Sequence, residues 1–147
     1  SRPWWLLVVL ALAVATWGGG FDVLYALQDV AFDKSQRLYS LPVALGERRA
    51  LAVARLLHVA TVVCLSLVGI ATFAGTHQGA FYALGVAIAA GLLVYEHSLV
   101  RADDFSRLDA AFFMMNGIIS ITFFVCVLTE RLIHQPVGLY ALLRGGT

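Results

Sequence analysis

The sequence predicts an all-α, polytopic membrane protein built as a bundle of four spanning helices. Hydrophobic residues make up 61% of the 147 residues and charged residues only 13%, and the mean hydropathy is +0.85, far from the averages of water-soluble domains. The apolar residues form runs long enough to cross a hydrocarbon core of roughly 30 Å. These runs lack the alternation of apolar and polar residues that marks a barrel strand, so we expect helices.

The four predicted spans cover residues 4–27, 50–75, 79–95 and 110–129. The first carries no charge before Asp22, and Trp4 and Trp5 at its start are typical of a membrane interface. The chain opens at Ser1 without an initiator methionine, and this first run is too long for a secretory signal. We therefore interpret it as a genuine span in a chain that is a fragment or has been processed.

Two of the three links between the spans are long and charged. Residues 76–78 predict a tight turn, whereas the polar links 29–49 and 96–109 fall on one side of the membrane if there are four spans. Seven of the ten Lys and Arg residues lie in or next to these two links. The positive-inside rule makes that side cytoplasmic, and we expect a multi-pass protein of the inner cell membrane. Most acidic residues share this side, which favours a polar, functional face.

The end of the first span holds the sharpest chemical feature. On a continuous helix, at 100° per residue, Asp22, Asp29 and Asp33 would fall within about 40° of one face, with Tyr25 beside them. Asp29 and Asp33 are one turn apart, so their charges repel unless a cation lies between them. Carboxylate ligands suit Mg²⁺, which takes one or two of them and completes its shell with water and substrate phosphate.

Two basic residues, Lys34 and Arg37, follow at once and could neutralise the oxygens of a diphosphate. Asp22 lies roughly 10 Å deeper along the helix, where a charge is costly. Two aspartates at a helix end can also be ordinary solvated residues, and it is Asp22 on the same face that favours a metal–diphosphate site. Residues 40–46 predict a short helix, either a lid over the site or a plain connector.

These residues also carry a resemblance to a known family. Residues 22–33 read DVLYALQDVAFD, which resembles the D-x-x-Y-A-x-x-D-x-x-x-D pattern that ends one helix of the UbiA superfamily of intramembrane prenyltransferases. Residues 34–46, KSQRLYSLPVALG, look like the link of that family. Residues 96–120, EHSLVRADDFSRLDAAFFMMNGIIS, look like the bacterial UbiA-like branch that serves menaquinone or ubiquinone synthesis.

The resemblance implies a Mg²⁺-dependent polyprenyltransferase. Such an enzyme transfers a polyprenyl group from polyprenyl diphosphate to an aromatic acceptor, of hydroxybenzoate or hydroxynaphthoate type, in respiratory quinone biosynthesis. It implies that Asp29 and Asp33 are metal ligands, and that Asp22 and Tyr25 are catalytic residues near the allylic diphosphate. The lipid tail would run between helices into the bilayer.

One departure from the family pattern bears on activity. The family also uses an N-x-x-x-D-x-x-x-D motif on an earlier helix, and this sequence has none, since Asn116 is followed by no matching aspartates. We therefore interpret residues 1–147 as the C-terminal half of a larger UbiA-like bundle. It would be inactive alone and need missing N-terminal helices or a partner chain. The alternative is a non-enzymatic helical membrane subunit or a quinone-binding partner.

Several other polar residues have two readings. His58 and His97 suggest haem ligands, but their positions along the predicted spans differ in depth, so we expect hydrogen-bonded packing roles. Glu96 and Arg101 belong to a charged link that is either solvated or orders a cap in which Arg101 binds phosphate or the acceptor. Asn116 predicts an interhelical hydrogen bond, with acceptor binding as the alternative.

The remaining composition is less informative. The glycines inside the spans favour close helix packing rather than phosphate binding. The two cysteines, Cys64 and Cys126, lie in apolar runs and match no metal or disulfide pattern. A net charge of +1 argues against a nucleic-acid partner.

Overall fold

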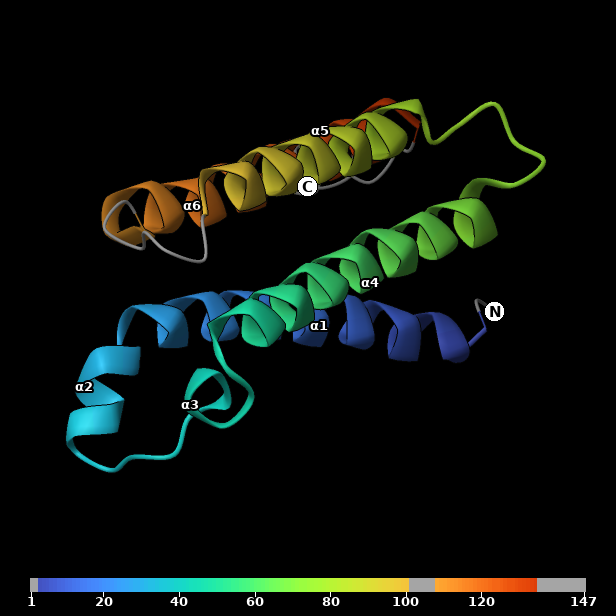
Figure 1. Cartoon of the computed structure of the whole chain (residues 1–147). Helices are drawn as coiled ribbons and strands as arrows, with labels where there is room; N and C mark the ends of the chain where they lie inside the picture. Colours follow the sequence, from blue (N-terminus) through green and yellow to red (C-terminus); the bar gives the residue numbers. More distant parts are fainter. Residues whose placement is uncertain (1–2, 101–107, 135–147) are drawn as a thin grey trace, which may run out of the picture.

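The structure, a computed structural model, describes residues 3–100 and 108–134, and these residues contain helices and no strand (Figure 1). Four helices are long and apolar enough to cross a membrane, so the predicted all-α transmembrane class is confirmed. The six helices are α1 (Trp5–Gln28), α2 (Val30–Ser35), α3 (Leu41–Leu45), α4 (Glu47–Phe73), α5 (Ala80–Leu99) and α6 (Leu108–His134).

The helix ends differ from the predicted spans in two useful places. α4 begins three residues earlier than expected, at Glu47, where an acidic residue in the first turn suits the helix dipole. α5 continues to Leu99, so the prediction that the third span ends at residue 95 was wrong. The extra turn of α5 brings Glu96 and His97 into the bundle instead of into a solvated link.

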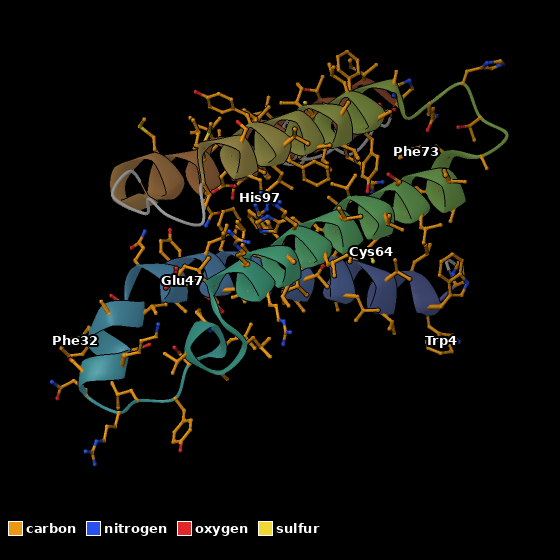
Figure 2. The ribbon with its side chains drawn as sticks, in the orientation of Figure 1. Trp4, Phe32, Glu47, Cys64, Phe73 and His97 are labelled. Atoms are coloured by element: carbon orange, nitrogen blue, oxygen red, sulfur yellow. The ribbon has the colours of Figure 1, made fainter. Side chains whose placement is uncertain are left out.

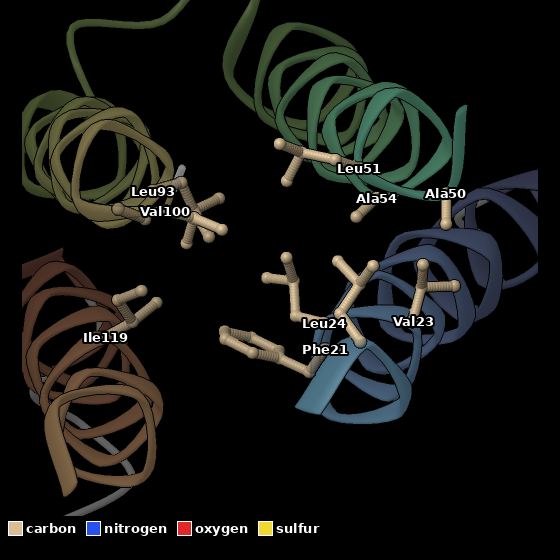
Figure 3. Close-up of a cluster of buried hydrophobic side chains, with 11 residues drawn as sticks. Phe21, Val23, Leu24, Ala50, Leu51, Ala54, Leu93, Val100 and Ile119 are labelled. Carbon is tan, nitrogen blue, oxygen red and sulfur yellow. The ribbon is translucent and has the colours of Figure 1, made fainter. Parts of the chain in front are cut away.

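The spanning helices form two antiparallel pairs, α1 with α4 and α5 with α6. Viewed along the helices, the pairs face one another across a shared apolar core (Figure 3). The core side chains include Phe21 and Leu24 of α1, Leu51 and Ala54 of α4, Leu93 of α5 and Ile119 of α6. Large apolar residues on the outer sides of all four helices are exposed, as expected for surfaces that contact lipid.

Small residues allow α1 and α4 to approach closely. Ala50 and Ala54 of α4 are fully buried, and Gly20 of α1 is buried against the ring of His58, farther along α4. Deeper in the same interface the hydroxyl groups of Thr16 and Thr61 are 2.9 Å apart and hydrogen-bonded. Small and hydroxyl-bearing residues at such contacts are typical of membrane helix pairs.

The turn between α4 and α5 is fixed by a residue of α6. Gly79 adopts φ 100° just before α5, a left-handed conformation that suits glycine. Its amide donates to Glu130 Oε1 at 2.7 Å, and the amide of Phe81 donates to Glu130 Oε2 at 2.9 Å. Glu130 therefore satisfies the free amides at the start of α5 from another helix. The link between α4 and α5 runs over residues 74–79, so it is longer than the tight turn predicted at residues 76–78.

Two short helices lie at the end of the α1–α4 pair (Figure 1). α2 leaves α1 at an angle, and α3 packs against both α1 and α4. Ser40 is extended before α3, Pro42 occupies its first turn and is buried, and Gly46 with φ 83° ends it. The short helix predicted for residues 40–46 is therefore confirmed.

Candidate functional site

The aspartate segment is centred on a break between two helices. α1 ends at Gln28, Asp29 has φ −92° and ψ 3°, and α2 begins at Val30. The prediction that Asp22, Asp29 and Asp33 share one face of a continuous helix was therefore wrong. The chain changes direction at Asp29, so Asp33 lies on a different helix axis from Asp22.

The pairing of Asp29 with Asp33 survives this break. The amide of Asp33 donates to the carbonyl of Asp29 at 2.8 Å, which keeps the two residues one helical turn apart. Asp29 is exposed and Asp33 is half-buried. Two carboxylates at this spacing, open to solvent, have the donor chemistry of a Mg²⁺ site that is completed by water and phosphate oxygens. Within residues 3–100 and 108–134, no three His, Cys, Asp or Glu side chains gather as a metal site.

Asp22 lies on the face of α1 that is opposite to the buried residues of this helix. Its neighbours Phe21, Val23 and Leu24 are buried, whereas Asp22 is exposed. The helices described in the structure leave this face of α1 uncovered. A carboxylate on the uncovered face of a spanning helix is costly in hydrocarbon, so this face needs water, a cation or further protein against it.

Tyr25 lies between the uncovered face and the interior of the bundle. It is half-buried on α1. Glu96 is fully buried, and among residues 3–100 and 108–134 neither of its carboxylate oxygens has a hydrogen-bond partner. The interpretation of Glu96 as part of a solvated link was therefore wrong. Ala89, Leu93 and Val100 share its buried face of α5, a periodicity that would have predicted this burial had the helix been extended.

The two basic residues of the motif are placed differently. Lys34 lies 3.9 Å from Glu47 at the start of α4, and both side chains are largely solvent-accessible. Such a surface ion pair is weak, so the Lys34 ammonium stays available to an anion. Arg37 is exposed and has φ 55°, a left-handed conformation that is unfavourable for a residue with a side chain. Figure 2 shows that Phe32, between the aspartates, points away from the helix bundle.

The argument from depth did not predict that the buried His58 and the half-buried His97 form a pair. His58 Nδ1 of α4 lies 2.8 Å from His97 Nε2 of α5, and Figure 2 shows His97 directed toward α4. The expected difference in depth was wrong because the helix ends are not level. His58 is eleven residues from the start of α4, whereas His97 is two residues from the end of α5, so α4 extends roughly 13 Å past α5. The expected hydrogen-bonded packing role is confirmed.

An apolar cavity of about 280 Å³ lies between the four spanning helices. Trp17 of α1, Val62 of α4, Leu93 of α5 and Phe123 of α6 are among its lining residues. Its walls are almost entirely apolar, and the indole nitrogen of Trp17 is buried without a partner in the described part of the chain. Such a cavity suits a hydrocarbon chain rather than a polar group.

The structure does not support a role for two of the predicted site residues, Arg101 and Asn116. Arg101 lies outside the described residues. Asn116 is half-buried on α6, and its backbone carbonyl accepts a hydrogen bond of 2.9 Å from Ser120. Its side chain forms no hydrogen bond with the residues described, so the predicted interhelical bond is not observed.

Of the spanning glycines, only some are packing points. An added Cβ at Gly20 would collide with the ring of His58, at Gly69 it would lie 2.6 Å from Tyr82, and at Gly85 it would lie 2.9 Å from Cys126. The same atom at Gly18 or Gly91 would meet nothing within 4 Å. The close-packing prediction therefore holds for the first three only.

Comparison with known proteins gives one match. The family model described as the UbiA prenyltransferase family matches residues 1–118, about four-fifths of the chain. No curated protein and no solved structure matches the chain.

Proposed function

Because the chain belongs to the UbiA prenyltransferase family, we propose that it transfers a polyprenyl group from polyprenyl diphosphate to an aromatic acceptor in respiratory quinone biosynthesis. The observation that carries this proposal is the Asp29–Asp33 pair. The two residues lie one helical turn apart at the end of a spanning helix, next to a bundle that contains an apolar cavity. Polyprenyl diphosphate has a polar head and an apolar tail, so its binding site needs charged groups next to an apolar space.

Asp29 and Asp33 would hold the divalent cation, since both offer carboxylate oxygens from one turn of backbone. Mg²⁺ would supply positive charge to the leaving diphosphate. Lys34 and Arg37, on the same exposed segment, would contact the outer phosphate oxygens as fixed positive charges. The positions of these residues favour binding of a diphosphate at the membrane surface, on the cytoplasmic side by the charge distribution.

The transfer itself breaks the bond between the allylic carbon and the diphosphate oxygen and forms a bond from that carbon to the aromatic ring. The ring then loses a proton, which balances the step. Asp22 and Tyr25 would line the side of α1 nearest the allylic group, because they lie deeper than the aspartate pair. The apolar residues around them would keep water from the developing cation.

We further propose that residues 1–147 form the C-terminal half of the catalytic bundle. The exposed position of Asp22 supports this, because a spanning helix has no reason to present a carboxylate to lipid. Preceding helices of the same polypeptide, or a partner chain, would cover this face and bring the first aspartate motif. The aromatic acceptor would then bind between the two halves.

The test is prenyl transfer by the full-length protein, reconstituted in lipid with a prenyl diphosphate and either hydroxybenzoate or hydroxynaphthoate. We expect Asp29→Asn and Asp33→Asn each to lower kcat by about 10²-fold or more, and removal of divalent cations with EDTA to abolish transfer until Mg²⁺ is restored. Glu47→Gln is the matched control, since it removes a partly exposed carboxylate next to the same segment.

Two outcomes would contradict the proposal. Equal losses in the control and in the aspartate variants would show that the effect is general surface charge. Normal folding of the full-length protein with no transfer to either acceptor would favour the alternative of a non-enzymatic membrane subunit or quinone-binding partner.

A further inference from the structure

The contact between α4 and α5 is loose and is held by two polar links. A cleft of about 530 Å³ opens between the two helices on their outer side, with Val59, Val63 and Val94 among its walls. Near the cytoplasmic end His58 bonds His97 at 2.8 Å. Nearer the other end, the Tyr82 hydroxyl of α5 donates to the Leu65 carbonyl of α4 at 2.9 Å. Because few apolar contacts join these helices, we expect each polar link to hold the part of the contact in which it lies.

The first of these links also reaches α1. His58 is only 2% exposed, and its ring lies directly against the backbone of Gly20, where even a methyl group would collide with it. The ring also packs on Phe21, with centroids 4.8 Å apart. One imidazole of α4 therefore touches α1 on one side and is hydrogen-bonded to α5 on the other.

This three-helix contact lies level with the proposed reacting end of α1. Gly20 is two residues before Asp22 and less than two turns before Tyr25 on the same helix. A change in the rotation or depth of α1 at Gly20 is passed to Asp22 and Tyr25 through a rigid helix. Displacements of about 1 Å at reacting groups can lower rates by about 10²-fold.

We propose that His58 and His97 are positioning residues, whose hydrogen bond and contact with Gly20 set α1 relative to α5 so that Asp22 and Tyr25 keep their catalytic placement. The inference rests on the proposed function for its catalytic consequence, and on the geometry alone for the placement of the helices. Neither histidine touches the aspartate pair, so each acts through α1.

The chemistry of the bond suggests conservative replacements. One ring nitrogen must donate and the other accept. The amide of asparagine occupies the place of Nδ1, and that of glutamine the place of Nε2. His58→Asn and His97→Gln can therefore keep a polar link between the helices, whereas His97→Leu cannot. Tyr82→Phe removes the other link between the same two helices and is the matched control.

The first readout is geometric and needs no activity. Spin labels at Ala15 on α1 and Val94 on α5, both exposed, would report the distance between the helices in a background without the two native cysteines, in lipid nanodiscs. We expect a single narrow distribution of label distances for the protein with both histidines and a broader or shifted distribution for His97→Leu. His97→Gln should restore the narrow distribution, and Tyr82→Phe should leave it unchanged.

The second readout is prenyl transfer by the full-length protein. We expect His97→Leu to lower kcat by about 10²-fold with a smaller change in the KM for prenyl diphosphate, since the aspartate pair is intact. His97→Gln and His58→Asn should recover most of the rate, and Tyr82→Phe should keep it even if the melting temperature falls.

An unchanged distance distribution in His97→Leu would overturn the proposal, as would an equal loss of kcat in Tyr82→Phe. If His97→Leu broadens the distribution but the unmodified protein transfers no prenyl group, the positioning of the helices stands and the proposed function fails.

Discussion

Substituting Gly20 by alanine tests the tightest glycine contact in the described part of the chain. An added methyl group would occupy space already taken by the His58 ring, and the ring cannot withdraw freely because it is hydrogen-bonded to His97 and packed on Phe21. Overpacking of this kind typically costs about 1–3 kcal/mol. Losing the histidine hydrogen bond would add about 1 kcal/mol. Alanine recovers about 0.5–1 kcal/mol through its better helix propensity.

The net expectation is that Gly20→Ala lowers the free energy of unfolding by about 1–3 kcal/mol. Gly18→Ala, two residues away on the same helix, is the control because its added methyl group would meet nothing within 4 Å. It should be neutral or more stable by up to about 1 kcal/mol. Reversible unfolding in mixed detergent micelles measures both values. The reasoning fails if the two variants differ by less than about 0.5 kcal/mol.

Two further substitutions test other features. Glu130→Gln should lower the free energy of unfolding by about 1–2 kcal/mol, because the amide side chain keeps only one oxygen for the two amides at the start of α5. Unchanged stability in the same unfolding assay would contradict this capping role. Arg37→Gly should raise stability by about 1 kcal/mol since Arg37 has φ 55°, whereas Arg37→Ala should not. Both changes should raise the KM for prenyl diphosphate, and an unaltered KM would remove Arg37 from the diphosphate site.

The aspartate segment shows how far sequence spacing can be trusted. The four-residue spacing of Asp29 and Asp33 survived because a single helical turn depends only on local backbone hydrogen bonds. The seven-residue relation to Asp22 did not, because the helix axis changes direction at Asp29. Nothing in the residues around Asp29 is a strong helix breaker, so we attribute this bend to the packing of α3 against α1 and α4 and of α2 against α3.

The histidines and Glu96 show that helix ends predicted from sequence do not fix which residues meet or become buried. Depth counted from the predicted ends of the spans separated His58 from His97, although they are in contact, since a residue count cannot tell whether two helices end at the same level. The charged neighbours of Glu96 favoured a solvated link, although the helix carries it into the interior. The error on Glu96 came from ending the third span one turn too early, whereas the error on the histidines came from taking the ends of α4 and α5 to be level.

By itself the sequence determined the fold class, the four spans, the short helix before α4, the membrane family and the spacing of the aspartate pair. These follow from hydropathy over about 20 residues and from local backbone geometry, which any chain with this pattern must obey. Only the tertiary structure decided that α1 breaks at Asp29, that Asp22 faces away from the helix pair, and that Gly20, His58 and His97 meet. Those features depend on the relative level, tilt and rotation of helices, which packing between distant residues sets.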